Sequence, residues 1–129
     1  MSQVKIYALK SHIDENRVLI SQGIHDAIIT ALHYPKEKKA QRFIPLEKEN
    51  FFYPDGRTDQ YTIIEISMFE GRSTEAKKSL IRQIFKNLTE LTNMSEQDIE
   101  ITIFETPKSN WGIRGMIGDE LDLNYKVDV

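Results

Sequence analysis

The feature that most constrains this chain is an internal repeat of pattern with a period of about 60 residues. Three segments of the first half fall on three segments of the second half when the sequence is shifted by that period. The matched pairs are residues 4–9 with 62–69, 14–32 with 74–92, and 41–46 with 101–106. A single domain is therefore predicted to contain two units of one design, at about 2–48 and 61–107, followed by a C-terminal segment at 108–129.

The periodicity of apolar residues assigns an element type to each matched segment. Ile99, Ile101 and Ile103 alternate with polar residues, which is the period of two that a pleated strand requires. The first and third matched pairs are read as strands on this basis. The middle pair carries apolar residues at helical spacing instead. Its stripes are Ile20, Ile24, Ala27, Ile28 and Ala31 in the first half, and Leu80, Ile84, Leu88 and Leu91 in the second.

Polar residues mark where the two predicted helices begin. Ser11 and Ser73 precede the helical stretches and are positioned to accept hydrogen bonds from free N–H groups of the first turn. Tyr34-Pro35 and Asn93-Met94-Ser95 end the stretches. Each half is thus a β-α-β unit, in which the crossover connection between the two parallel strands is right-handed.

Two such units predict an α+β fold, a duplicated β-α-β with a four-stranded mixed sheet and both helices on one face. The strand at 62–69 has apolar or aromatic residues on its other face as well, including Ile63 and Phe69. A bare apolar sheet face requires cover, and self-association is its simplest source. The sequence therefore predicts an oligomer with this face at the interface.

The remaining segments are predicted to dock on the sheet or extend it. Residues 49–60 contain the turn Pro54-Asp-Gly56 and an apolar anchor at Phe51-Phe52-Tyr53. Residues 107–115 are rich in turn residues. The C-terminal segment, residues 121–129, alternates apolar and polar side chains throughout, which predicts an edge strand that extends this sheet or a neighbour's.

Composition excludes several classes of function. The net charge is −3, and no basic block exceeds Lys36–Lys39, so a nucleic-acid-binding face is not expected. No apolar run has the length of a membrane span, and the start of the sequence does not resemble a signal peptide. There is no cysteine, and His12, His25 and His33 have no metal-ligand spacing. We expect a cytoplasmic protein without metal or cofactor.

Two motifs of the second half, read together, resemble one protein family. They are Gly71-Arg-Ser-Thr-Glu-Ala-Lys77 and Glu105-Thr-Pro-Lys-Ser-Asn-Trp-Gly-Ile-Arg-Gly115, about thirty residues apart around a helix and a strand. This pair of motifs resembles the corresponding motifs of the tautomerase superfamily, in the branch that contains malonate semialdehyde decarboxylase. The resemblance covers about half of the chain, and the first half is similar mainly through its β-α-β pattern.

The resemblance implies a homotrimer with inward-facing sheets and active sites at the N-terminal ends of the first strands. In the family, an N-terminal proline amine exchanges protons, and arginines bind the carboxylates of small keto-acid or halo-acid substrates. Here Ser2 stands at the position of that proline, and Pro35 is the first proline of the chain. Arg72 matches one of two family arginines, Glu70 replaces the other, and Lys38 falls near a family acid.

Four residues other than Ser2 are candidates for a site, each with a structural alternative. Arg72 is predicted to bind a carboxylate or to be a structural arginine at a loop–helix junction. Trp111 and Arg114, on a hairpin permitted by the flanking glycines, are predicted to line a cleft or to make a trimer contact with Trp111 as anchor. Arg42 could serve either purpose.

Ser2 is the most informative position. Removal of the initiator methionine is expected before a residue this small, and it would expose an α-amine with a reference pKa of about 7.7–8.0. Desolvation would favour its neutral, basic form, so a primary amine could act as a general base or form an imine. The alternative is a frayed, inert terminus.

Three hypotheses therefore stand at this point. The first is an enzyme that transfers protons on a small carboxylate, held by Arg72 or Arg114. The second is a non-catalytic trimeric binding or interaction protein that kept the fold. The third is an unrelated α+β domain, which a structure without the internal two-fold repeat would establish.

Overall fold

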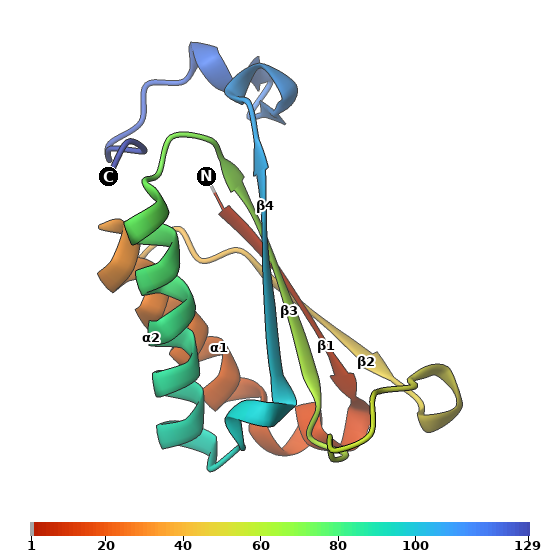
Figure 1. Ribbon diagram of the computed structural model, residues 1–129. Coiled ribbons are helices and arrows are strands. Elements are labelled where there is room, and N and C mark those ends of the chain that lie inside the picture. The colour runs from red at the N-terminus through yellow and green to blue at the C-terminus, as the bar shows by residue number, and fades with distance from the viewer. Residues whose placement is uncertain (1) are drawn as a thin grey trace.

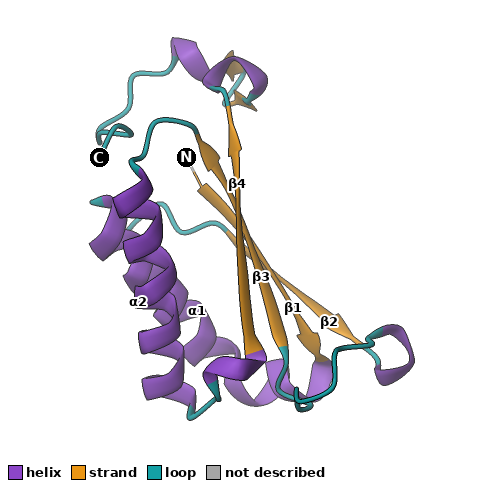
Figure 2. Cartoon of the chain, viewed as in Figure 1, coloured by secondary structure: helices purple, strands orange, loops and turns teal. Residues whose placement is uncertain are grey.

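The computed structural model describes residues 2–129, and it contains both predicted units (Figure 1). Its main elements are β1 (Ser2–Leu9), α1 (Lys10–Leu32), β2 (Gln41–Leu46), β3 (Thr62–Phe69), α2 (Thr74–Thr92) and β4 (Ile99–Thr106). A short hairpin follows, made of β5 (Gly112–Ile113) and β6 (Met116–Ile117). The α+β fold, the four-stranded mixed sheet and the position of both helices on one face are confirmed (Figure 2).

The sheet order β2-β1-β3-β4 expresses the duplication directly. Within each unit the strands are parallel, as β1 with β2 and β3 with β4, while β1 and β3 are antiparallel to each other. The repeat extends to the loops, because the 3-10 turns Lys48–Asn50 and Lys108–Asn110 are separated by the same period. The two units are therefore related by a local two-fold axis between β1 and β3.

The core lies between the sheet and the two helices. Alternate residues of the central strands, such as Val4, Ile6, Ile64 and Ile66, are almost completely buried there. The predicted helical stripes supply the opposite side, with Ile20, Ile24, Ala27, Ile28, Leu80, Ile84 and Leu88 all buried. Leu91, at the end of the second stripe, is 37% exposed. None of the described helices is long and apolar enough to cross a membrane.

The helix starts differ between the units, and one capping prediction is wrong. Ser73 caps α2 as expected, since its hydroxyl accepts a hydrogen bond from the Ala76 amide at 3.1 Å. Ser11 caps nothing, because α1 begins at Lys10 directly after β1 and places Ser11 in the first turn. The chain therefore turns straight from strand to helix in the first unit, but passes through a short loop before α2 in the second.

The other face of the sheet is mixed, so the prediction of a bare apolar face is wrong. Its ends are covered within the chain: Tyr61 stacks on Phe51 at 5.7 Å, and Phe69 packs edge-on against Trp111 at 5.1 Å. The residues 49–60 excursion is docked as predicted, although Phe52 is 91% exposed. Between the two ends lie polar and half-buried side chains, among them Gln3, Lys5, Tyr7, Glu65 and Ser67.

The C-terminal segment does not extend the sheet of its own chain, which corrects that part of the prediction, while pairing with a neighbour's sheet stays a prediction. Residues 121–129 pair with no strand of the described chain. They still alternate between covered and exposed positions. The sequence pattern therefore predicts which side chains face the protein, but not whether the segment pairs with a strand. Figure 1 shows the segment crossing from the hairpin beyond β4 to the start of α2, near the start of β1. The tail thus covers the end of the protein where Ser2 and Arg72 lie.

Candidate functional site

Arg72 owes its position to a single glycine. Gly71 has a φ of +132°, a backbone conformation that residues with a side chain rarely adopt. This conformation directs the chain out of β3 and away from a helical path. In the first unit the equivalent residue, Ser11, is helical. Arg72 consequently stands in the loop before α2, with its side chain turned inward and only 5% of the residue exposed.

The Arg72 guanidinium is buried without a matching set of acceptors. Nη1 donates to the carbonyl of Phe69 at 3.3 Å. Nε and Nη2 are buried and have no hydrogen-bond partner among residues 2–129. Glu105, a carboxylate that affects the pKa of Arg72, is itself paired with Lys77 at 2.7 Å. A cation in this state strongly favours an anionic partner with two oxygens.

Ser2 lies at the same end of the molecule and is 3% exposed, so it is not a frayed residue. Its main-chain nitrogen donates to the hydroxyl of Tyr34 at 3.2 Å, in a buried hydrogen bond. Tyr34 follows α1 directly and is itself 3% exposed. The nitrogen that the sequence singled out is therefore fixed in the interior, beside a phenol.

Tyr125 brings the tail into the same cluster. Its ring meets the Tyr34 ring edge-on at 4.9 Å, and the Lys38 ammonium lies 5.0 Å from the Tyr125 ring centroid. The Tyr125 hydroxyl is buried and makes no well-formed hydrogen bond within residues 2–129, although Tyr34 and Arg72 are near enough to act on its pKa. We call Ser2, Tyr34, Arg72 and Tyr125 the buried polar cluster.

Electrostatics connects the members of this cluster. Burial lowers the pKa of Arg72, and the nearby hydroxyls of Tyr125 and Tyr34 oppose that shift. Burial also raises the pKa of Tyr125 far above its ordinary value, with Tyr34 adding to the shift and Arg72 opposing it. The Tyr125 phenol therefore stays neutral around pH 7, and Arg72 supplies the positive charge of the cluster.

The structure does not bring the other candidates to this cluster within one protomer. Arg114 is exposed at the tip of the β5–β6 hairpin, where it and Gly115 have the positive φ values of a two-residue turn. Trp111 anchors that hairpin on Phe69 and also lines a 340 Å³ hollow with Gln3 and Ser67. Arg42 is exposed on β2.

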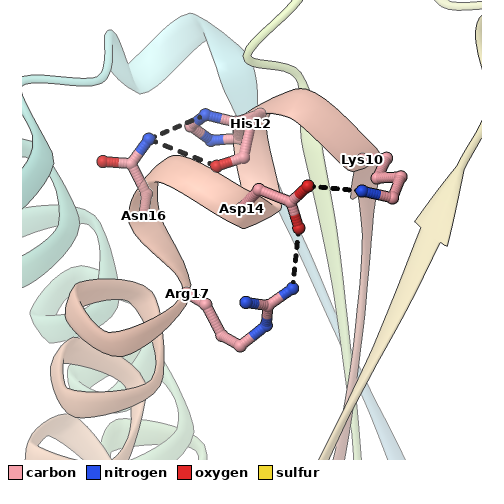
Figure 3. A network of polar contacts seen from close by, with 5 residues as sticks. All are labelled: Lys10, His12, Asp14, Asn16 and Arg17. Carbon is pink, nitrogen blue, oxygen red and sulfur yellow. Dashed lines mark hydrogen bonds and ion pairs between the residues drawn. The ribbon is translucent and has the colours of Figure 1, made fainter.

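The opposite end of the sheet holds a second polar network, at the start of α1 (Figure 3). Asp14 accepts hydrogen bonds from Lys10 at 2.6 Å and from Arg17 at 2.9 Å. The Asn16 amide nitrogen lies 3.1 Å from Nδ1 of His12. His12 is the residue equivalent to Arg72 under the repeat. Its Nε2 is buried without a partner in the described chain, and burial lowers its pKa.

Sequence reasoning missed two members of the buried polar cluster. The sequence marks Tyr34 only as the end of a helix, and Tyr125 only as part of an alternating segment. The signal for Tyr125 was present in that alternation, which puts it on the covered side of the tail. Nothing in the spacing could have indicated that these two residues, 91 positions apart in the sequence, share one contact.

Comparison with known proteins identifies the family to which this arrangement belongs. The sequence model described as "Tautomerase enzyme" matches residues 38–114, which is more than half of the chain. The chain belongs to the tautomerase superfamily.

Two curated relatives support the assignment. The chain is 39% identical to a 2-hydroxymuconate tautomerase of Comamonas testosteroni over 57 residues, 44% of this chain and 90% of the relative. That relative therefore has about the length of one β-α-β unit. The chain is also 27% identical to the probable tautomerase YusQ of Bacillus subtilis, over 71% of this chain and 76% of the relative.

Solved structures share the whole fold. Malonate semialdehyde decarboxylase superposes with a TM-score of 0.79 at 17% identity, over 88% of this chain and 92% of the other. A fused 4-OT described as an asymmetric trimer superposes with a TM-score of 0.79 at 20% identity, over 92% and 97%. The duplicated fold is thus that of known tautomerase-superfamily proteins, and fused 4-OT proteins form trimers.

Proposed function

We propose that this protein binds a small carboxylic acid, of the 2-keto acid class, in the buried polar cluster and transfers a proton on it. The observation that carries the proposal is the Arg72 guanidinium, which is buried with two nitrogens lacking partners within residues 2–129. A carboxylate would accept hydrogen bonds from both and would neutralise the charge.

The Ser2 nitrogen is our candidate for the proton-transfer group. Removal of Met1 would convert it from an amide to a primary amine, at a position already buried and hydrogen-bonded to Tyr34. Burial and the nearby Arg72 cation both disfavour a protonated amine, so the neutral form is available as a base. An amine of this kind could move a proton between carbon and oxygen of an enolisable keto acid.

The assembly proposed with this function is a homotrimer. The half-buried, mixed centre of the sheet face is suited to contact with copies of the same chain, because its polar residues can pair across a symmetric interface. Trp111 and Arg114 stand on a hairpin at the rim of this face, and we propose that they complete a site across the subunit boundary. Light scattering at micromolar concentration tests the assembly, and a stable monomer contradicts it.

Binding is tested first by titrating wild type with pyruvate and phenylpyruvate in a calorimeter. Arg72→Ala should weaken binding about ten-fold or more, since a hydrogen bond to a charged group contributes roughly 1.5–3 kcal/mol. Arg114→Ala should weaken it only if the hairpin contributes to the site. Unchanged affinity in Arg72→Ala would remove the cluster from the site.

Catalysis is tested through the amine. Protein starting at Ser2 should ketonise or enolise phenylpyruvate, and protein with Met1 retained or with an N-terminal tag should not. Ser2→Ala should keep the activity, because the hydroxyl has no role, and Ser2→Pro should raise it. Equal turnover with and without the tag would exclude the amine. Binding without turnover in all forms would favour a non-catalytic binding protein instead.

A further inference from the structure

The tail at residues 121–129 covers the buried polar cluster through a small number of contacts. The Ser73 amide, at the start of α2, donates to the main-chain oxygen of Val129 at 2.8 Å. Val127 is 5% exposed and lies over Gly71, so that a Cβ added to Gly71 would come within 3.1 Å of the Val127 Cγ1. The absence of a side chain at Gly71 is what allows this close approach.

The contact between Tyr125 and the cluster is poorly satisfied. Its ring is well placed against Tyr34. Its buried hydroxyl and the Arg72 guanidinium are near enough to affect each other's pKa, but neither that hydroxyl nor Nε and Nη2 of Arg72 makes a well-formed hydrogen bond. The tail therefore meets the Arg72 guanidinium with a neutral phenol at poor hydrogen-bonding geometry. A closed arrangement of this kind is destabilised relative to one in which the groups are solvated or bound.

We propose that residues 121–129 form a displaceable strap, and that a small carboxylate gains access to Arg72 by moving Tyr125 off the cluster. This inference rests on the proposed function, because it concerns access to the same site. The strap has the properties of a segment that opens at low free energy: no strand pairing, few buried side chains, and alternate residues in solvent.

When a strap competes with the ligand, the apparent affinity equals the intrinsic affinity multiplied by the fraction of molecules in which the strap is open. Val127→Ala removes two methyl groups from the main apolar anchor and should shift the balance toward the open form. The affinity for pyruvate should then rise by up to about fifteen-fold, at roughly 0.8 kcal/mol per buried carbon. Asn124→Ala, an exposed position of the same tail, is the matched control and should change nothing.

Hydrogen exchange at the Ser73 amide reports the strap without any ligand, because that amide is bonded to Val129. Val127→Ala should speed Ser73 exchange while leaving the amide of Ile66, in the central strand, unchanged. Saturating pyruvate should also speed Ser73 exchange in wild type. Slower exchange with pyruvate, together with weaker binding by Val127→Ala, would overturn the proposal, since the tail would then close on the ligand as a wall of its site.

The two proposals fail in different ways. Equal pyruvate affinity in wild type and Val127→Ala, with binding still lost in Arg72→Ala, leaves the proposed function intact and overturns the strap. Absence of binding in both wild type and Val127→Ala removes the function and the strap together. Binding that appears only in Val127→Ala supports both, because it shows that the tail closes a competent site.

Discussion

Replacing Arg72 by methionine should stabilise the ligand-free protein while abolishing its binding of carboxylates. Methionine keeps a straight apolar stem and removes Nε and Nη2, which are buried without partners in residues 2–129. Each unsatisfied buried donor costs about 1–3 kcal/mol. Loss of the Nη1 bond to Phe69 returns about 1 kcal/mol. The net gain in the free energy of unfolding should therefore be about 1–5 kcal/mol.

Urea unfolding at pH 7 measures this gain, at one fixed protein concentration because an oligomer's apparent stability depends on concentration. Arg17→Met is the control, because Arg17 is an exposed arginine paired with Asp14 (Figure 3), and its loss should leave the unfolding midpoint unchanged. A midpoint that falls in Arg72→Met would refute the reasoning. It would mean that the guanidinium is satisfied in the assembled protein and that its role is structural.

Three further predictions concern stability. Burial lowers the pKa of His12 below its unfolded value of about 6.5, so the free energy of unfolding should decrease as the pH falls below that value. His12→Leu should therefore reduce the difference between the urea midpoints measured at pH 7.5 and at pH 5. Ser73→Ala should cost about 0.5–2 kcal/mol of unfolding free energy through loss of the cap, whereas Ser11→Ala should cost much less. Gly71→Ala should destabilise by about 1–3 kcal/mol, because it strains a φ of +132° and crowds the tail, while Gly112→Ala meets no neighbour within 4 Å and should be tolerated.

The sequence was sufficient to predict the helices and strands, because the periodicity of apolar residues is a local property of the chain. Both helical stripes and the strand alternation appear in the printed residues, and the repeat adds the information that one unit occurs twice. The exact start of α1 was not available in the same way. Ser11 has the chemistry of a cap, but the helix begins one residue earlier because β1 runs directly into it, a choice made by the packing of the unit.

Only two of the four residues of the buried polar cluster could be predicted from the sequence, for a related reason. Arg72 and Ser2 could be named from a resemblance, since both stand at positions fixed by motifs. Tyr34 and Tyr125 come together only because the tail folds back to the start of α2, and that path depends on a close approach at Gly71. Alternation in residues 121–129 indicates which side chains face inward, but a strand and a docked extended segment produce the same alternation.

The duplication relates the two ends of the sheet, but the two ends carry different groups. The local two-fold axis makes Thr62 equivalent to Ser2 and His12 equivalent to Arg72, so each end of the sheet begins from the same geometry. Thr62 lies within the continuous chain, and its nitrogen is always an amide without basic character. At that end the arginine position is occupied by a histidine whose buried state favours the neutral form, and Thr58 binds the nearby Asp98 carboxylate at 2.6 Å. Among the described residues, the guanidinium that is 5% exposed and has two buried nitrogens without partners lies at the Ser2 end. At the other end Arg57 is only half-buried, with one such nitrogen, so the two ends now differ in how strongly they favour an anion.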